Sequence, residues 1–426
     1  MIPQEAIDQL NDLDIVRVLQ DDGLELKRAG SLYECCCPFH GEKTASFKVS
    51  SAKGIAHCFG CGKTWGPINF IMERRTLTFV EACQHLGNMY GIKWDEKEPT
   101  PEELAARFER EQLFRANDFA AEFFRGQYKL SEAAQKYAPH KSALLRHAKD
   151  KKANINDLIK AGLIKVSGED GHYYDAFIGR LMFPIRNRTG NLVGFSGRII
   201  NPKKNAEGKE PPKYINTSET PIFKKGETLF GYFEAQRIAA RRDLLNIVEG
   251  QPDVIRLASI DQQNTVAPMG TALTSKQINL VKKIVSKVVL IGDNDPAGQT
   301  AIVDHGERLV AAGLNVRVMT LSDGKSKDAD EYFKYKGNTY DEALAQSTAD
   351  FVDFMYQSKM PGAISQNDRL DAINYICGLL ISYNETLARM YLDKFGKEDK
   401  QGKIWNETFY KLKNKRQLDS IREKKQ

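Results

Sequence analysis

The sequence predicts a multi-domain α/β protein with a small metal-binding domain first, a parallel β-sheet in its second half and helices at the C-terminal end. Three observations predict this fold class. Five of the seven cysteines lie between residues 35 and 61, apolar runs alternate with helical segments over 244–340, and a helical pattern returns after 341. A length of 426 residues allows two to four domains.

The composition argues against several classes of protein. The N-terminal stretch MIPQEAIDQLNDLDIVRVL has no basic start followed by an apolar run, and no window has the apolar length of a membrane span. The cysteines gather in one segment instead of forming a disulfide framework, which indicates a metal site in a reducing cytoplasm. The net charge of +6 permits a nucleic-acid partner without requiring one, because phosphate binding depends on local basic patches.

The chain divides into four predicted regions. Residues 1–95 hold the cysteine cluster and an amphipathic run, and the polar stretch WDEKEPTPEE after it is a linker candidate. Residues 101–243 begin with a helix that starts at Pro101 and continue with short strands, among them RLMFPIRNRTGNLVGFSGRII. Residues 244–340 form the parallel sheet, and residues 341–426 form a helical region with a basic tail.

Two pairs of side chains in the cysteine segment have the spacing of zinc ligands. Each pair encloses two residues, seventeen residues separate the pairs, and the four predicted ligands are Cys37, His40, Cys58 and Cys61. Pro38 in the first pair, and Gly60 and Gly62 in the second, would form the tight corners at which backbone N–H groups turn toward sulfur. Because four ligands close a site, the predicted zinc is structural.

Cys35, Cys36 and His57 compete for a place in this ligand set. Using Cys36 would change the gap to His40, and consecutive residues of an extended segment point to opposite sides, so three cysteines in a row cannot all face one metal. We therefore expect Cys35 and Cys36 to be strand residues that lead into the site, one facing each way. Cys83 is expected to be a small apolar residue of an amphipathic helix.

Lysines and aromatic residues surround the predicted zinc site. The lysines are Lys43, Lys48, Lys53 and Lys63. The candidates for exposed rings are Phe47, Phe59 and Trp65. Cations interleaved with aromatic rings suit single-stranded nucleic acid, whose bases stack on rings, although core packing in a small domain is the alternative for each ring.

A second cluster is predicted from acidic residues that follow three strands. Glu249 ends the strand of LLNIVEG, Asp293 and Asp295 end that of KVVLIGDND, and Asp328 and Asp330 follow a third. Ligands of open parallel sheets bind beyond the carboxyl ends of the strands, so these carboxylates should converge. Clustered carboxylates repel one another unless divalent metal neutralises them, which predicts magnesium ions able to activate a 3′-hydroxyl and stabilise a pentavalent phosphate.

Together the two clusters resemble the bacterial DnaG-type DNA primases. CPFHGEKTASF and HCFGCGKTWGPINFI are similar to that family's zinc-binding domain, while VEG, DND and DAD are similar to its Toprim fold, which topoisomerases and some nucleases share. Between them, RLMFPIR, GFSGR and PPKYINTSETPIFKKGETLFGYFEA resemble the basic half of the polymerase core. The resemblance covers about residues 1–95 and 172–340, and the zinc ribbon and KYINTSETPIFKKG favour primase over other Toprim enzymes.

The resemblance implies what each predicted region is. Residues 1–95 would be a zinc-ribbon domain that binds template, and 101–243 a mixed α+β basic subdomain of the RNA polymerase core. Residues 244–340 would be the catalytic Toprim subdomain with a Rossmann-like parallel sheet, and 341–426 a helical subdomain. About eighty-five residues after the Toprim part would leave none for the family's separate helicase-binding domain, and no GxxxxGK[ST] phosphate loop occurs.

The resemblance also implies residue roles. Glu249 would ligate magnesium and assist as general base, while Asp293 and Asp295 would hold the ions. The carboxylates completing an acidic ring would be Asp253, Asp328 and Asp330. The residues lining the groove for template and nucleotide phosphates would be Arg180, Arg198, Lys213, Asn216 and Lys225. The family usually has glycine where this chain has Asn294, and proline where it has Ala329; asparagine tolerates a positive φ, so the turn should survive.

The implied activity is that of a DNA primase, a nucleotidyltransferase and DNA-directed RNA polymerase that makes short RNA primers on single-stranded DNA. Its implied cofactors are one structural Zn²⁺ and two or more catalytic Mg²⁺ or Mn²⁺ ions. Its partners would be template, NTPs and the nascent primer, with a replicative helicase and a single-strand-binding protein as further candidates. We expect a monomer in the bacterial or phage-host cytosol, away from membranes. Two alternatives remain: a Toprim nuclease or topoisomerase, and a non-catalytic single-strand-binding or scaffold protein.

Overall fold

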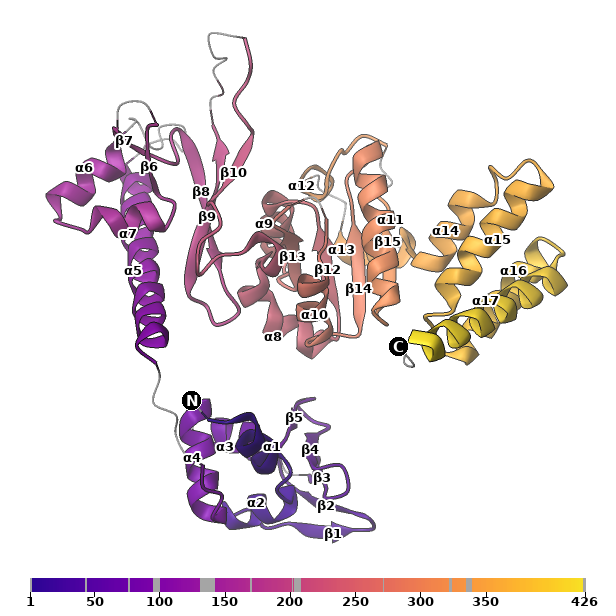
Figure 1. Ribbon diagram of the computed structural model, residues 1–426. Coiled ribbons are helices and arrows are strands. Elements are labelled where there is room, and N and C mark those ends of the chain that lie inside the picture. The colour runs from indigo at the N-terminus through magenta and orange to yellow at the C-terminus, as the bar shows by residue number, and fades with distance from the viewer. Residues whose placement is uncertain are drawn as a thin grey trace. The chain divides into compact units, whose positions relative to one another are not determined.

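The computed structural model describes residues 2–42, 44–75, 77–94, 100–130, 142–168, 171–200, 202, 208–270, 272–321, 324–334 and 339–423. Lys43 and half of the linker candidate, residues 95–99, lie outside the described residues. The chain forms two compact units, Met1–Phe108 and Glu109–Gln426, and each is described by itself (Figure 1). None of the described helices is long and apolar enough to cross a membrane.

The first unit is a five-stranded antiparallel sheet whose strands follow one another in chain order. The strands are β1 (Lys27–Ala29), β2 (Leu32–Cys35), β3 (Phe47–Ser50), β4 (Ile55–Cys58) and β5 (Thr64–Trp65). Its helices are α1 (Gln4–Asn11), α2 (Ile15–Asp21), α3 (Pro67–Arg75) and α4 (Phe79–Tyr90). Thr78 begins α4 with a reciprocal capping box to Glu81, so the predicted amphipathic run is two helices. β3 and β4 lie between the two ligand pairs, which agrees with the zinc ribbon that the resemblance implies.

Burial in this sheet corrects three expectations. Phe47 alternates inward with Val49 along β3, and both are fully buried; Trp65 is 2% exposed. Only Phe59 of the three candidate rings is exposed, at 72%. Cys36 is not a strand residue, because β2 ends one residue earlier and Cys36 is exposed. Cys83 is fully buried on α4, as expected.

The second unit begins with helices and a small antiparallel sheet. The helices are α5 (Pro101–Leu130, which starts in the first unit), α6 (Ala143–Asp150) and α7 (Ile155–Lys160). The strands are β6 (Ile164–Val166), β7 (Tyr173–Asp175), β8 (Arg180–Arg186), β9 (Leu192–Ile199) and β10 (Tyr214–Asn216), followed by the 3₁₀ turn η1 (Lys225–Glu227). β8 and β9 form the predicted hairpin around Gly190, and β10 pairs with the other edge of β9.

A six-stranded sheet follows, with strand order β11-β13-β12-β14-β15-β16. The strands are β11 (Leu229–Phe230), β12 (Leu245–Val248), β13 (Thr265–Pro268), β14 (Lys287–Ile291), β15 (Asn315–Met319) and β16 (Thr348–Asp350). The strands β12, β13, β14 and β15 run parallel, as predicted for this region, whereas the edge strands β11 and β16, which were not predicted, are antiparallel. Along β12 and β13 every residue is buried, as is typical of a parallel sheet covered on both faces.

Helices cover both faces of this sheet. The helices are α8 (Tyr232–Arg242), α9 (Gln251–Ser259), α10 (Ser275–Lys282), α11 (Pro296–Ala311), α12 (Ala329–Tyr332) and α13 (Tyr340–Gln346). One apolar core joins the sheet to α8, α10 and α11, and a second joins it to α9, α12 and α13. This is the Rossmann-like arrangement that the resemblance implies, and in Figure 1 the strands β8–β10 lie beside it.

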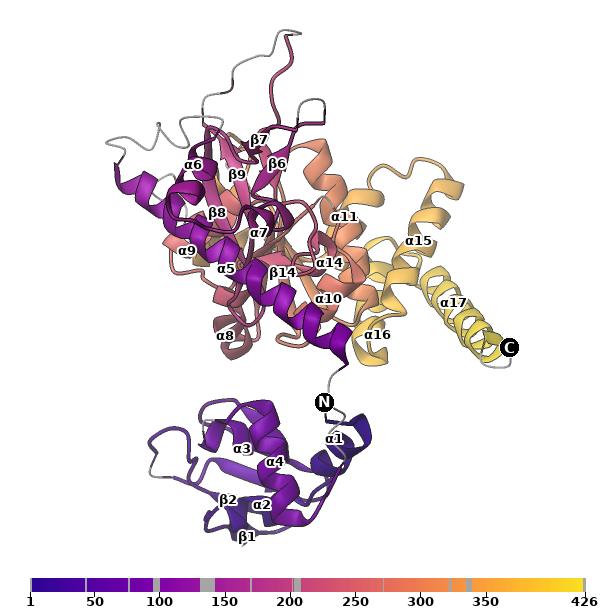
Figure 2. The same cartoon turned by 60° about the vertical axis from the view of Figure 1, so that its left-hand side comes forward.

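The end of the chain is a helical bundle, as expected. Its helices are α14 (Phe351–Lys359), α15 (Gln366–Leu380), α16 (Glu385–Glu398) and α17 (Gly402–Glu423). They enclose a core around Phe395, Trp405 and Phe409; Figure 1 shows the four helices grouped at one end of the unit, and Figure 2 shows α15–α17 at that end. The boundaries 1–95, 101–243, 244–340 and 341–426 of the four predicted regions stay predictions.

Candidate zinc centre and acidic cleft

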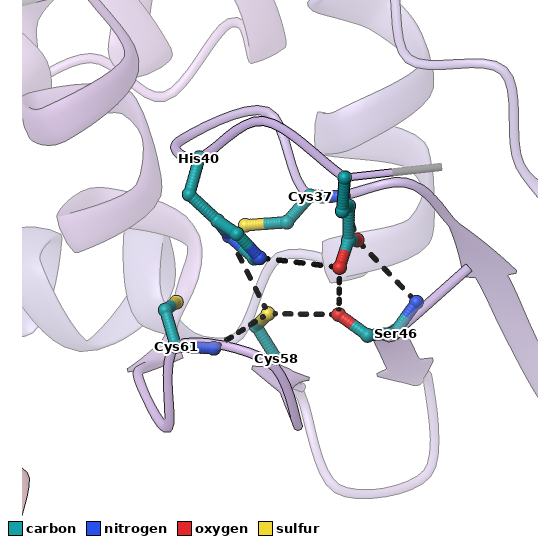
Figure 3. Close-up of polar contacts among 6 residues, drawn as sticks. Cys37, His40, Ser46, Cys58 and Cys61 are labelled. Carbon is teal, nitrogen blue, oxygen red and sulfur yellow. Dashed lines mark hydrogen bonds and ion pairs between the residues drawn. The ribbon is translucent and has the colours of Figure 1, made fainter. Parts of the chain in front are cut away.

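The four predicted zinc ligands come together in the first unit. One donor atom from each of Cys37, His40, Cys58 and Cys61 lies within 4.8 Å of the other three (Figure 3). The second corner forms where β4 ends, because Gly62 has a φ of 72° and the Cys61 N–H donates to the Cys58 sulfur at 3.4 Å. Three cysteines and one histidine in this arrangement would suit tetrahedral zinc.

The competing residues lie outside this set. His57 shares a 2.8 Å hydrogen bond between its Nδ1 and the hydroxyl of Thr64.

Burial raises the pKa of Cys37 to about 12. Burial also acts to raise the pKa of Cys58, but hydrogen bonds from Ser46 and the Cys61 backbone outweigh it and lower that pKa. A bound cation would hold both sulfurs as thiolates, and the donor set therefore fits zinc.

The acidic residues of the second unit lie at the carboxyl edge of the parallel sheet. Glu249 follows β12, and its Oε1 accepts a hydrogen bond from the Asp293 N–H at 3.0 Å. A Cβ on Gly298 would lie 2.6 Å from that oxygen and 2.4 Å from the Asp293 carbonyl, so only glycine lets α11 begin this close. Asp295 caps α11 by accepting from the Gly298 N–H at 2.8 Å.

The remaining predicted carboxylates belong to α9 and α12. Asp253 is buried and accepts from the backbone N–H groups of Gly250 at 3.2 Å and Asp330 at 3.0 Å. Asp328 caps α12 by accepting from the Glu331 N–H at 2.8 Å. The carboxylate of Asp330 pairs with Arg256 at 2.8 Å. Helices α9 and α12, which lie far apart in sequence, are thus joined by a hydrogen bond and an ion pair.

A cleft of about 340 Å³ brings acidic and basic residues together. Its polar and charged lining is Arg198, Lys213, Tyr214, Asn216, Glu249, Gln251, Asp253, Asp293, Asp328 and Asp330. One wall comes from β9 and β10, where Arg198 pairs with Tyr214 across the strands, and the other from the carboxyl edge of the sheet. Asp295 is exposed and lies outside this lining.

Two of the five predicted basic-groove residues lie elsewhere. Arg180 is only 6% exposed, and its Nη1 donates to the carbonyls of Gly197 and Pro212 at 3.0 Å each, so it braces β9 and the segment before β10. Lys225 lies in η1, where its backbone N–H donates to Glu219. Neither lines the cleft. Arg180 was expected to line the groove. In the structure its guanidinium is instead buried and held by backbone carbonyls.

The electrostatics of the cleft favour a cation. Burial, and then the neighbouring Glu249, raise the pKa of Asp293 to about 7. Burial raises the pKa of Asp253 to about 6. Asp293 and Asp253 are therefore harder to ionise than ordinary carboxyl groups. A bound divalent ion would favour their ionised forms and lower both pKa values. The carboxylates are more widely spread than the zinc set, which alone among the described residues gathers three or more metal-ligating side chains within 4.8 Å.

Two residues that matter here were missed by the sequence analysis. Asn294 was noted only as a departure from the family, but its Nδ2 donates to the carbonyls of Leu321 and Ser326 at 2.9 Å each. Its own N–H donates to the Lys327 carbonyl at 2.7 Å, and it does not have the positive φ that the sequence analysis considered. Arg256 was not singled out at all. No sequence signal identifies either contact, because the partners lie far away in the sequence and only the fold brings them close.

Comparisons with known proteins agree with this geometry. A family described as CHC2 zinc finger matches residues 2–102, one described as DNA primase catalytic core, N-terminal domain, matches 110–236, and one described as Toprim-like matches 246–333. The DNA primase of Aquifex aeolicus is 35% identical over 367 residues, covering 83% of this chain and 71% of that protein. The chain belongs to the DnaG-type bacterial DNA primase family.

Other primases extend the comparison. The DNA primase of Escherichia coli K12 is 32% identical over 414 residues, which cover 90% of this chain and 69% of that protein. A crystal structure of the zinc-binding and RNA polymerase domains of the Aquifex aeolicus primase has a TM-score of 0.59 at 29% identity, covering 94% of this chain and 98% of that one. A DnaG primase catalytic domain bound to ssDNA has a TM-score of 0.58 at 26% identity, covering 68% and 99%.

The chain is shorter than several of these primases. It spans 64% of the Salmonella typhimurium primase, at 33% identity, and 57% of the Pseudomonas aeruginosa primase, at 32% identity. The zinc-finger match and the Cys/His cluster together support zinc, and the Toprim match suggests a divalent metal in the acidic cleft.

Proposed function

We propose that this chain is a DNA primase that synthesises short RNA primers from NTPs on single-stranded DNA. The observation that carries the proposal is the cleft, in which Arg198 and Lys213 face Glu249 and Asp293. A nucleotidyl transferase needs both groups in one place, because cations hold phosphates while carboxylates handle the metal and the hydroxyl proton. Membership of the primase family supports the same reading.

The reaction joins the 3′-hydroxyl oxygen of the growing primer to the α-phosphorus of an NTP. The bond between the α-phosphorus and the bridging oxygen breaks, pyrophosphate leaves, and the hydroxyl proton passes to a base. Glu249, whose Oε1 accepts a hydrogen bond from the Asp293 N–H, would take that proton. Magnesium or manganese bound by Glu249, Asp293 and Asp295 would lower the pKa of the hydroxyl and stabilise charge on the phosphate.

The remaining cleft residues would bind and position the template, the nucleotide and the metal ions. Arg198 and Lys213 would bind the phosphates of template and nucleotide, and the amide of Asn216, which donates to the Met269 carbonyl at 3.3 Å, would orient the same wall. Asp253, Asp328 and Asp330 would complete the acidic ring. The zinc unit would engage the template, and the protein would act in the bacterial or phage-host cytosol. A replicative helicase and a single-strand-binding protein are proposed further partners.

The test is synthesis on a defined single-stranded template. Incubation with all four NTPs and magnesium should yield short RNA that is complementary to the template and is absent when template or NTPs are withheld. Cleavage of the DNA without NTPs would instead show a Toprim nuclease. Binding of the DNA with neither synthesis nor cleavage would show a non-catalytic binding protein.

A further inference from the structure

Glu42 lies at the centre of the hydrogen bonds around the zinc centre, although it is not one of the four predicted ligands. Its Oε1 accepts from the Cys37 backbone N–H at 2.5 Å. Its Oε2 accepts from the Ser46 hydroxyl at 2.5 Å and lies 3.1 Å from His40 Nε2. One carboxylate thus contacts both members of the first ligand pair and the residue that begins the approach to β3.

The contact to His40 distinguishes the two nitrogens of its imidazole. Nε2 faces Glu42, whereas Nδ1 lies 3.9 Å from the sulfur of Cys58. In a tetrahedral site with Zn–S near 2.3 Å and Zn–N near 2.0 Å, a sulfur and a nitrogen ligand are separated by about 3.5 Å. A nitrogen that donates a hydrogen to a carboxylate cannot also bind zinc, so Nδ1 is left for the metal.

Ser46 extends the same network to the second ligand pair. Its hydroxyl oxygen lies 3.2 Å from the sulfur of Cys58 as well as 2.5 Å from Glu42 (Figure 3). The Cys61 N–H contacts that sulfur from the other side at 3.4 Å. The two ligand pairs, which are far apart in sequence, are therefore connected through Glu42 and Ser46 even without a metal.

Gly60 gives independent support, because it leaves space where the network lies. A Cβ at Gly60 would lie 2.8 Å from His40 Nε2, 3.0 Å from the Ser46 hydroxyl oxygen and 3.1 Å from Glu42 Oε2. Its φ is not positive, so the backbone there does not itself require glycine. The position needs a residue without a side chain so that these three polar groups can meet.

We propose that Glu42 is a positioning residue of the zinc centre, which fixes Nδ1 of His40 as the metal-binding nitrogen and, through Ser46, couples the two ligand pairs. Removing a partner of this kind typically weakens metal binding by roughly 10–100-fold. The inference concerns how tightly the chain holds zinc. It does not depend on primer synthesis.

The first test measures zinc affinity of the full chain by competition with a chromophoric chelator. Glu42→Ala should bind zinc at least roughly tenfold more weakly than the wild type. Glu42→Gln keeps an oxygen that can accept from Nε2–H and should recover part of the loss. Glu34→Gln is the matched control, since Glu34 pairs with Lys48 on β2 and β3 and contacts none of the four ligands, and it should bind zinc normally.

The second test determines which ring nitrogen of His40 binds the metal. With cadmium-113 in place of zinc and nitrogen-15 in the histidines, scalar coupling to cadmium should appear at Nδ1 of His40 in the wild type. Coupling at Nε2 would overturn the proposal, as would unchanged zinc affinity in Glu42→Ala. If Glu42→Ala does not fold, Glu42→Gln and Gly60→Ala decide: wild-type zinc affinity in both would equally overturn it.

Discussion

The carboxylate of Glu249 accepts a hydrogen bond from the backbone N–H of Asp293, with 3.0 Å between Oε1 and N. β12 and β14 pair in parallel, with Val248 opposite Ile291, so the residues that follow each strand emerge at the same edge. The two acidic motifs are thereby joined before any metal arrives. This contact explains why a sequence rule about strand ends locates the site.

Asp293 should make the free protein less stable as the pH rises. Its pKa of about 7 lies above the ordinary value near 3.9, so over that interval the folded chain keeps a proton that the unfolded chain has released. The resulting loss of stability is small below pH 4, grows between pH 4 and pH 7, and reaches its full size above pH 7. Asp293→Asn removes this destabilisation. Because Asp293 is only half-buried, we expect the free energy of unfolding to rise by about 1 kcal/mol at pH 8.

Thermal unfolding without added magnesium at pH 5 and pH 8 measures this effect. The advantage of Asp293→Asn over the wild type should be larger at pH 8 and should shrink when magnesium is added, because the ion stabilises the wild-type cluster more. Equal advantages at the two pH values would show that folding does not raise the pKa of Asp293.

Asn294 should influence how tightly the acidic cleft binds divalent ions. Asn294→Gly removes both side-chain hydrogen bonds to the Leu321 and Ser326 carbonyls and frees the loop that carries Asp328. We expect the magnesium concentration for half-maximal primer synthesis to rise roughly tenfold, and manganese binding measured by calorimetry to weaken in parallel. Gln299→Ala, an exposed amide on the first turn of α11, is the control. Unchanged metal dependence in Asn294→Gly would mean the brace is not needed.

Arg198 and Arg180 should separate binding from stability. Arg198→Ala removes a cation from the cleft wall and should weaken single-stranded DNA binding while lowering the slope of log affinity against log salt by about 1. Arg180→Ala leaves buried carbonyls unpaired and should cost roughly 1–3 kcal/mol in urea unfolding. Fluorescence anisotropy at several salt concentrations measures the first effect. The reverse pattern would place Arg180 in the groove after all.

Phe59 and Phe47 should behave differently although both were candidates for base stacking. Phe59 is 72% exposed and meets His57 edge-on at 4.7 Å between ring centroids. Phe59→Ala should leave zinc binding and unfolding unchanged but weaken single-stranded DNA binding by about 1–3 kcal/mol. Phe47→Ala should destabilise the unit by about 3–5 kcal/mol, because the ring is fully buried. If DNA binding is unaffected by Phe59→Ala, this ring is not a stacking platform.

Sequence reasoning succeeded where spacing alone fixes geometry. The ligand pairs converge because two-residue gaps build the same corner twice, and Glu249 and Asp293 converge because parallel strands end at one edge. It failed where burial depends on partners elsewhere in the chain. Trp65 is buried because Phe39 stacks on it at 4.6 Å, and Arg180 is buried because β9 and Pro212 supply its carbonyls.

The short elements and the supporting contacts were also beyond the sequence. β11 and β16 span two and three residues, so neither shows a period, and their pairing depends on the sheet already being formed. Glu42 and Asn294 hold their sites through hydrogen bonds to residues that only the fold brings near. Their identities gave no sign of these contacts.

The most direct test of the account compares primer synthesis by the wild type, Asp293→Ala and Asp341→Ala on one single-stranded template. Asp341 is an exposed carboxylate of α13 outside the cleft, so its variant controls for the loss of a negative charge. We expect short template-directed RNA from the wild type and from Asp341→Ala, and none from Asp293→Ala. Full synthesis by Asp293→Ala would contradict it.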